Sequence, residues 1–430
     1  MRVLVLGATG LIGSHVLKAL QQTGCDAIGA SRKKPASAGN IEWKELEFSS
    51  LVHPQEWHPH LQGIDAVINC VGIIREVHPG DFIRLHQQMP IALFAACEQT
   101  GISRVVQISA LGSEPQAQTT YWRTKSAADA DLLLRRLTAT IVRPSLVYGD
   151  DGASSRVFMM LASLPFAAMP MAHSALVQPI HVDDLTAVLV KLLTGNKEMP
   201  TELAAVGPRA LSIADYVGAL RQGMSAAPGI VVTIPPPLAR VIAACAGLIP
   251  SSALTRDSLK MLEQSADGSN TADPAPITTL LGAPPRDPRH FTRTQQKGQA
   301  VLAWAAPMFR FFIAMLWLLT AYASWFGWSH EESRQWLMQC GLPQAWTEPT
   351  LLAACLLDTG IGMVLLLYYR RWIWPVQIVL VLGYTIVMSC FLPQFWMHPF
   401  GPLSKNLPIL AIMFTMWRLA ENNTKKKGSW

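Results

Sequence analysis

Hydrophobic residues in the first 150 positions gather in short runs that are apolar throughout, and longer stretches with helical spacing separate them. The apolar runs lie at 2–6, 26–31, 65–71, 103–109 and 139–143. The helical stretches extend to about residue 23 and lie near 82–100 and 119–136. Wholly apolar strands that alternate with helices are typical of a parallel sheet covered on both faces. We therefore predict an α/β, Rossmann-type doubly wound parallel sheet.

The pattern from 150 to 290 is less regular and predicts a small substrate lobe attached to this sheet. Residues 179–194 indicate a strand end and a helix. Residues 202–224 indicate a strand, a turn and a helix capped by Ser212. The apolar run 238–249 is too short to span a bilayer, so we expect it either in the core or as an interfacial helix.

Four longer apolar runs follow residue 300 and predict a four-helix transmembrane bundle within 301–425. They lie at about 308–328, 350–369, 372–392 and 403–420. Each run approaches the roughly 20 residues that a helix needs to cross a bilayer.

Charge and tryptophan content divide the chain at the same point. Only 14 of the 130 residues after position 300 are charged, against 50 of the 300 before it. Eleven of the 14 tryptophans also lie after position 300, and indole rings favour the headgroup level of a membrane. The alternative, a hydrophobic soluble bundle, does not account for this distribution. We interpret the net charge of +6 as a sign of membrane orientation and expect no nucleic-acid partner.

Basic residues predict the orientation of the bundle. They flank the first, second, third and fourth runs at Arg310, Arg370, Arg371, Arg418, Lys425, Lys426 and Lys427. The positive-inside rule then places the N-terminal part and the C-terminal tail in the cytoplasm, as in a multi-pass protein of the cytoplasmic (inner) membrane. The first residues, MRVLVLGATG, are typical of a strand and a turn, so we expect no secretory signal.

The seven cysteines show neither a CxxC pair nor another metal-ligand spacing. They are spread through apolar runs, which is typical of packed, reduced thiols. We expect no metal site.

A glycine-rich turn, GATGLIG, links the first predicted strand to the first predicted helix. Glycine allows a tight turn and lets the backbone approach a pyrophosphate, which binds at the helix N-terminus. This GxxGxxG arrangement predicts a dinucleotide site formed by Gly7, Thr9, Gly10, Leu11, Ile12 and Gly13.

The end of the second predicted strand indicates which dinucleotide binds. An acidic residue there would bind the ribose 2′-hydroxyl of NAD, but the chain has Ser31 and Arg32 followed by two lysines. A guanidinium suits a 2′-phosphate by charge and by bidentate geometry. We predict that NADP(H) is preferred over NAD(H), and a solvated basic turn is the alternative.

Tyr121 and Lys125 form a YxxxK pair on the helix predicted after the strand at 103–109. Positions i and i+4 share one face of a helix, so the phenol and the ammonium can reach one site. A nearby cation lowers a tyrosine pKa from about 10, which predicts Tyr121 as a proton carrier. Lys125 could also hold the nicotinamide ribose.

These features make the chain resemble the short-chain dehydrogenase/reductase superfamily over roughly residues 1–290. The matching residues are Gly7, Gly10 and Gly13, NCVG at 69–72, Tyr121 and Lys125, RPSLVYG at 143–149 and PIHVDD at 179–184. The last two segments look like the extended and atypical branches. These branches include NAD-dependent epimerases of nucleotide sugars and the nucleotide-binding accessory subunit of respiratory complex I. SALG at 109–112 and the YWRTK segment look closer to the complex I type.

The resemblance implies an NAD(P)-binding domain over 1–300, with its substrate lobe mainly in 150–290. Tyr121 would be the general acid/base, with Lys125 as its pKa partner and ribose anchor. The residues that would border the cofactor are Asn69, Gly72, Pro144 and Ser145.

The resemblance also implies a serine that orients the substrate carbonyl, and the chain departs from the family here. The usual position holds Ala110 or Leu111. Ser109 is the candidate substitute, and Ser113 is another. Further along, we expect the PIHVDD residues His181, Asp183 and Asp184 to hold structure between the lobes rather than to take part in chemistry.

Residues 301–425 resemble the DoxX-like family of small four-helix membrane proteins, most clearly in PFGPLSKNLP at 399–408. Asp358 lies in the middle of the second run, where a carboxylate is costly without a partner or a function. Lys405 or His398 could supply the partner. A protonated Asp358 that hydrogen-bonds between helices is the alternative.

Three functions are compatible with this sequence. The first is a membrane-anchored NADPH-dependent oxidoreductase that transfers hydride to or from a carbonyl or hydroxyl carbon, or a quinone-like substrate, with an apolar small molecule as the expected partner. The second is a non-catalytic NADPH-binding sensor or an assembly factor for a membrane complex. The third is a nucleotide-sugar epimerase or dehydratase.

Overall fold

A computed structural model describes residues 1–423 of the chain, except 37, 40, 103, 196–199, 247–255 and 369. The chain divides into two compact units, Met1–Val301 and Leu302–Trp430. The lysines at 425–427, on which the predicted orientation partly depends, lie outside the described residues, as does the end of the apolar run 238–249.

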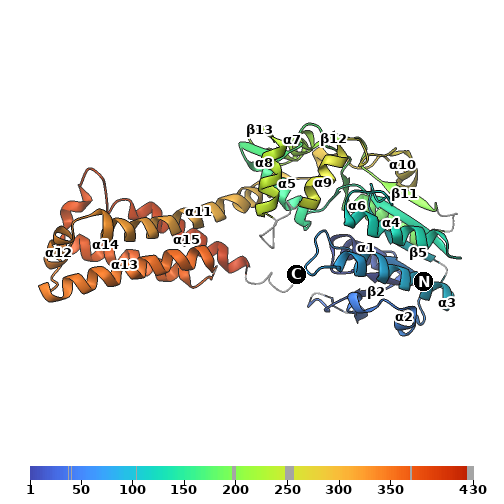
Figure 1. Ribbon diagram of the computed structural model, residues 1–430, viewed down its shortest axis with the longest axis horizontal. Helices are drawn as coiled ribbons and strands as arrows, with labels where there is room; N and C mark the ends of the chain where they lie inside the picture. The colour runs from blue at the N-terminus through green and yellow to red at the C-terminus, as the bar shows by residue number, and fades with distance from the viewer. Residues whose placement is uncertain are drawn as a thin grey trace. The chain divides into compact units, whose positions relative to one another are not determined.

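The first unit contains a parallel sheet with seven strands in the described part of the chain, in the order β11-β6-β5-β4-β1-β2-β3 (Figure 1). The strands are β1 (Arg2–Leu6), β2 (Asp26–Ser31), β3 (Trp43–Glu45), β4 (Ala66–Asn69), β5 (Arg104–Ile108), β6 (Thr138–Pro144) and β11 (Glu202–Ala205). Every neighbouring pair in this sheet is parallel. The predicted Rossmann-type parallel sheet is confirmed.

Helices cover both faces of this sheet, because successive side chains of each strand point to opposite sides. Val3 and Val5 of β1 belong to one core, and Leu4 and Leu6 belong to the other. The first core includes residues of α1 (Leu11–Gln22) and α6 (Val182–Thr194). The second includes residues of α2 (Pro54–Leu61), α3 (Met89–Thr100) and α4 (Thr120–Leu133). The doubly wound arrangement that the apolar strands predicted is therefore present.

The sequence pattern did not reveal β3 or α2. β3 has only three residues, too few to show a period, and it forms by pairing with β2. Its Trp43 covers Gly29, where a Cβ would overlap the indole ring. α2 has a proline at its first position and a second one, Pro59, inside, both of which mask a helical pattern. The helix predicted near 82–100 begins as the π-helix η2 (Ile83–Gln88) and continues as α3.

The substrate lobe consists of short elements around a core that includes Tyr148 and Tyr216. Its strands pair as β7 (Val147–Tyr148) with β10 (Ile180–His181), β9 (Leu176–Val177) with β12 (Leu211–Ser212), and β8 (Phe166–Pro170) with β13 (Ile230–Ile234). Besides α6, the helices that follow β7 are α5 (Ala153–Ser163), α7 (Ile213–Gly223), α8 (Pro236–Ala246), α9 (Arg256–Ser265) and α10 (Ala275–Leu281), and Ile277 of α10 packs in the first core of the large sheet. Ser212 caps α7 as predicted, because its Oγ accepts a hydrogen bond from the Asp215 amide at 3.0 Å.

The second unit is a helical bundle. Its helices are α11 (Lys297–Tyr322), which starts in the first unit, α12 (His330–Gln339), α13 (Gln344–Leu367), α14 (Ile373–Phe391) and α15 (Asn406–Asn423). Among the described residues, three segments are long and apolar enough to cross a membrane: Thr294–Gly327, Gln344–Leu367 and Ile373–Phe391. The fourth predicted crossing corresponds to α15, which is apolar but shorter. α12 was not predicted, because its polar residues show no apolar face.

Candidate functional site

The glycine turn between β1 and α1 has no room for side chains. Gly7 has a positive φ of 69°, and a Cβ there would lie 2.9 Å from the carbonyl oxygen of Cys70. A Cβ at Gly13 would overlap the carbonyl oxygen of Gly7. The backbone of β1, the turn and the start of α1 therefore form one tight unit, as the sequence predicted for a loop that a pyrophosphate can approach.

The N-terminus of α1 is open to an anion. Gly10 is the N-cap, so no side chain caps the first amides, and the first turn holds no acidic residue. Uncapped amides and the helix dipole favour a negatively charged group at this end. Thr9 is exposed, Leu11 and Ile12 are half-buried, and the Leu11 side chain packs against Gly149 and Gly152 of the lobe.

Ser31 and Arg32 occupy different environments at the end of β2. Ser31 is buried, its Oγ donates to the Lys33 carbonyl at 2.7 Å and it accepts from the Trp43 indole at 3.2 Å. Arg32 and Lys33 are exposed. The serine therefore shapes the turn, and the arginine is the residue that can reach a ligand.

Asn69 ends β4 and Gly72 follows three residues later, and only Gly72 is exposed. Asn69 is fully buried, its Nδ2 donates to Gln107 at 2.8 Å, and its Oδ1 accepts from the Val71 amide at 3.1 Å. A Cβ at Gly72 would lie 3.7 Å from both His86 Nε2 and Lys125 Nζ. Asn69 thus fixes the loop, while Gly72 brings the backbone next to the lysine.

Tyr121 and Lys125 lie together on α4, as their spacing predicted. The Lys125 Nζ lies 5.7 Å from the centroid of the Tyr121 ring and donates to the Ile108 carbonyl at 3.1 Å. Burial lowers the pKa of Lys125 to about 8, and the nearby charges of Asp129 and Cys70 oppose this shift. Both groups therefore reach one place beside the end of β5.

The pKa of Tyr121 differs from our expectation. We expected the nearby cation to lower it, but burial raises the pKa of Tyr121 to about 12. The ammonium of Lys125 lies over the ring rather than beside the hydroxyl, and it is directed to the Ile108 carbonyl. Desolvation of the phenolate therefore outweighs the attraction of the cation.

Ser109, the candidate for the carbonyl-orienting serine, is buried, and its hydroxyl is hydrogen-bonded. Its Oγ donates to Asp129 at 2.6 Å and lies 3.2 Å from the Ser113 hydroxyl. Asp129 also accepts from Arg143 at 3.4 Å. Burial raises the pKa of Asp129, and these hydrogen bonds and charges work against the rise. Ala110 is buried against Trp122.

Pro144 and Ser145 end β6 at the start of the lobe. Pro144 is buried at the edge of the sheet. The Ser145 Oγ donates to the Asn270 carbonyl at 3.3 Å and accepts from the Gln178 amide at 3.3 Å. In this structure Ser145 joins the sheet to the loop that follows α9.

His86 is a site residue that the sequence reasoning missed. It lies in η2, where its ring stacks on Phe82 and meets the Tyr121 ring edge-on at 5.3 Å. Its Nε2 accepts from the Ile73 amide at 3.0 Å, so its Nδ1 carries the proton, and that buried atom has no hydrogen-bond partner among the described residues. Burial and Lys125 lower the pKa of His86 to about 2. A lone histidine on an apolar helix gave no signal of this contact.

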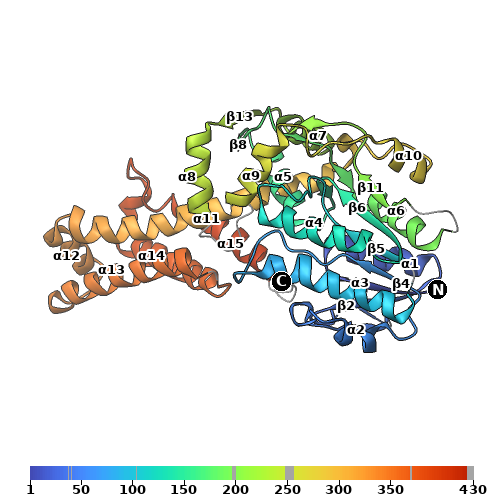
Figure 2. The same ribbon diagram turned by 45° about the vertical axis from the view of Figure 1, so that its right-hand side comes forward.

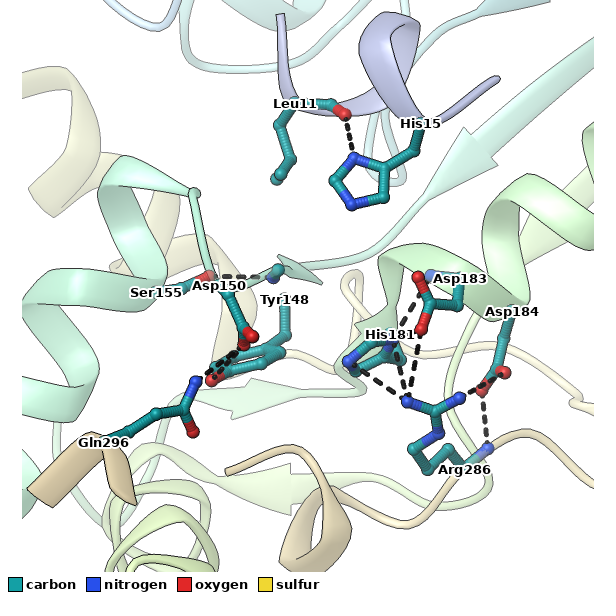
Figure 3. A network of polar contacts seen from close by, with 11 residues as sticks. Leu11, His15, Tyr148, Asp150, Ser155, His181, Asp183, Asp184, Arg286 and Gln296 are labelled. Carbon is teal, nitrogen blue, oxygen red and sulfur yellow. Dashed lines mark hydrogen bonds and ion pairs between the residues drawn. The ribbon is translucent and has the colours of Figure 1, made fainter. Parts of the chain in front are cut away.

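A polar network joins the start of α6 to the loop after α10 (Figure 3). Arg286 contacts His181 at 3.3 Å, Asp183 at 3.4 Å and Asp184 at 3.8 Å. His181 also caps α6 by accepting from the Asp183 amide at 3.2 Å. These contacts agree with a structural role for His181 and the two aspartates, which stays our prediction. The arginine that joins them could not be foreseen from a sequence separation of about 100 residues.

Comparison with known families matches the two parts of the chain separately. Residues 3–207 match the NAD dependent epimerase/dehydratase family, and residues 314–414 match the DoxX-like family. The chain joins an NAD-dependent epimerase/dehydratase domain to a DoxX-like domain. The epimerase/dehydratase family binds nicotinamide dinucleotide, which agrees with the glycine turn at the N-terminus of α1.

Curated relatives resemble the epimerase/dehydratase domain. Ceramide reductase of Caulobacter vibrioides is 27% identical over 192 residues, which are 44% of this chain and 59% of that protein. Subunit 9 of the NADH dehydrogenase [ubiquinone] 1 alpha subcomplex from Arabidopsis thaliana, a mitochondrial protein, is 26% identical over 44% of this chain and 49% of its own length. The chain thus spans about half to three fifths of these two relatives.

Solved structures share the fold of this domain. A nucleoside-diphosphate-sugar epimerase from Staphylococcus aureus has a TM-score of 0.55 at 15% identity, over 68% of this chain and 99% of that chain. MoeE5 in complex with UDP-glucuronic acid and NAD has a TM-score of 0.51 at 20% identity, over 70% of this chain and all of the other. At these identities the likeness concerns the fold.

Proposed function

We propose that the chain is a membrane-anchored, NAD(P)H-dependent oxidoreductase that transfers hydride to or from the carbonyl or hydroxyl carbon of an apolar or quinone-like molecule. The observation that carries this proposal is the placement of Tyr121 and Lys125. Both side chains meet beside the open backbone of Gly72, on the same edge of the sheet as the glycine turn. A phenol and an ammonium at the carboxyl edge of a Rossmann sheet suit proton transfer next to a nicotinamide.

In the proposed reduction, Tyr121 donates its proton to the substrate oxygen. Its pKa of about 12 keeps the phenol protonated at neutral pH, which suits a general acid. In this proposal the Lys125 ammonium, which lies 5.7 Å from the centroid of the Tyr121 ring, turns from the Ile108 carbonyl to stabilise the phenolate and to hold the cofactor ribose. The bound nicotinamide supplies the hydride.

An apolar substrate is supported by the side chains around this place. Ile74 and Val77, in the loop after β4, are 68% and 80% exposed, and Ile83 of η2 is also exposed. Large apolar residues at the rim of a polar site favour an apolar ligand. The name of one relative, ceramide reductase, agrees with a lipid-like carbonyl compound as the substrate class.

NADP(H) is our proposed cofactor, held at its 2′-phosphate by Arg32. The exposed guanidinium follows a strand end that holds Ser31 where an acid would select NAD. The membrane unit would anchor the enzyme with its N-terminal unit and C-terminal tail on the cytoplasmic side, as the charge distribution predicts.

A non-catalytic, NADPH-binding sensor or assembly factor is the second candidate. Ala110 at the usual serine position and the engagement of Ser109 with Asp129 favour it. So does the resemblance to a complex I subunit. Nucleotide-sugar epimerisation has the fold-level likeness as its support.

Tyr121→Phe separates these candidates. Purified full-length chain in detergent is assayed for NADPH and NADH oxidation with ceramide-like ketones, quinones and nucleotide sugars, and for cofactor binding by fluorescence. We expect Tyr121→Phe to lose turnover by at least about a hundredfold, the usual contribution of a general acid, with binding retained. The control is Tyr368→Phe, a change at an exposed tyrosine after α13. Unchanged turnover in Tyr121→Phe, or no turnover in the wild type, would reject the oxidoreductase.

A further inference from the structure

The substrate lobe carries an apolar surface that is not buried in the chain. In the parallel pair β8–β13, Phe166 lies opposite Ile230, and Val232 is two residues further along β13. Because side chains alternate along a strand, Ile230 and Val232 share one face with Phe166. These three side chains are 69%, 58% and 46% exposed. One face of this small sheet is therefore apolar and open.

Helix α8 extends this surface. It packs inward with its small residues Ala239 and Ala243, which are buried against Leu259 of α9. Its large apolar residues Leu238 and Val241 point away from this contact and are 52% and 59% exposed. This is the reverse of an ordinary surface helix, which buries its large apolar side chains. Figure 2 shows β8, β13 and α8 side by side in the lobe.

We infer that this surface, formed by Phe166, Ile230, Val232, Leu238 and Val241 and called the lobe patch below, inserts into the lipid bilayer. A contiguous apolar surface marks an interaction site. Among interfaces, a bilayer surface takes apolar side chains without demanding a complementary protein shape. The inference rests on the membrane location proposed above, and it adds that the lobe itself, and not only its anchor, contacts lipid.

The reason to expect lipid on the lobe patch is that the lobe is directly connected to a helix that could span a membrane. The segment Thr294–Gly327 is long and apolar enough to cross a membrane, and it starts inside the lobe. Ala300 of α11 is part of the lobe core, and Lys297 donates to the Ser225 carbonyl at 3.4 Å. No linker separates the two, because α11 runs without a break from Lys297 to Tyr322. The lobe is therefore joined to this candidate spanning helix without an intervening loop, which lowers the entropic cost of a second contact with the bilayer.

Insertion would give the lobe a direct path for an apolar substrate. A lipid-like carbonyl compound that partitions into the bilayer would then meet the enzyme without crossing water, where each exposed methylene is unfavourable. The patch would therefore serve substrate entry as well as attachment.

Quenching of a single fluorescent amino acid tests the lobe patch. The label replaces Val241 in the full-length chain, which is reconstituted in phosphatidylglycerol–phosphatidylcholine vesicles. Nitroxide-labelled lipids report contact with the bilayer, and iodide reports contact with water. Labels at Leu356 of α13 and at Leu134 after α4, 63% and 87% exposed, serve as the lipid and water controls.

We expect the label at 241 to be quenched by lipid to a degree close to that at 356, with 134 quenched by iodide. Quenching of 241 by iodide would overturn the inference, because the patch would face water. Quenching by neither would also overturn it, because protein would then cover the patch, and a dependence on protein density would identify a second copy. If 356 escapes lipid quenching, the membrane location itself fails, which is a different result from failure at 241 alone.

Discussion

Each unit of the chain buries an aspartate, and the two aspartates differ in what surrounds them. Asp129 of α4 receives hydrogen bonds from Ser109 and Arg143, and Lys125 is close enough to oppose its pKa shift. Asp358 of α13 is also buried, but its Oδ1 has no hydrogen-bond partner among the described residues. Neither Lys405 nor His398, which we considered as partners, forms a described contact with it.

The difference teaches what each carboxylate does. Asp129 belongs to a network whose members hold one another in place, and this network fixes the lysine of the site. Asp358 belongs to no such network among the described residues, so a function, a ligand or protonation of the carboxyl group has to offset the cost of its burial. The following predictions test whether the first unit depends on close contacts and charge pairing where the second does not.

The largest expected difference between the two units comes from replacing one glycine in each with alanine. Gly13→Ala would place a Cβ on the backbone of Gly7, which cannot move without breaking the turn. At Gly362 of α13 a Cβ would lie 2.7 Å from Cγ of Leu318, a side chain, and 3.1 Å from the Ala314 carbonyl oxygen, and this site is remote in sequence from the glycine turn. We expect Gly13→Ala to abolish dinucleotide binding, measured by cofactor fluorescence, and Gly362→Ala to leave it intact. An equal loss of dinucleotide binding in both variants would contradict the expected difference between the two units.

The second contrast concerns the aspartates themselves. Asp129→Asn removes a buried negative charge from between Lys125 and Arg143, which costs about 3 kcal/mol. Asp358→Asn removes no described ion pair, so we expect almost no change. Thermal unfolding of the full chain in detergent, with proteolysis to assign each transition to a unit, measures both. A large loss of stability in Asp358→Asn would show that this carboxylate has a structural partner after all.

The pH dependence of the unfolding free energy tests the burial of Lys125 in the first unit. Its pKa in the folded chain is about 8, against about 10.4 for an ordinary lysine. Between these values the unfolded chain binds more protons, so stability rises with pH by up to roughly 3 kcal/mol. We expect Lys125→Met to lack this rise when denaturant unfolding of the two proteins is compared across this range. Parallel pH profiles would contradict the burial of a charged lysine.

The smallest effect is expected outside the membrane segments of the second unit. His330 bonds the Trp325 carbonyl at 2.9 Å and Glu348 at 3.0 Å, and the carbonyl and the carboxylate raise its pKa. The resulting stability is full below a pH of about 6.5 and is lost as the pH rises through the higher folded pKa. His330→Gln should flatten this weak decline in unfolding temperature, and an unchanged decline would assign it to other groups.

Local sequence patterns predicted most of the fold. The five apolar strands, five helices of the first unit (α1, α3, α4, α6 and α7) and the three long apolar helices of the second unit follow from periodicity and run length, because extensive burial or a long apolar surface leaves a direct mark on composition. β3 and α12 were not found, since one has only three residues and the other is polar.

The candidate site likewise has features that follow from local sequence and features that depend on distant segments. By itself, the sequence determined the glycine turn, the Tyr121–Lys125 pair and the division of the chain into an epimerase/dehydratase part and a DoxX-like part with long apolar helices. These depend on residues that are neighbours along the chain. The tertiary structure alone decided that His86 meets Tyr121, that Asp129 engages Ser109, and that burial raises the tyrosine pKa. Contacts and desolvation between distant segments decide such properties, and no local spacing records them.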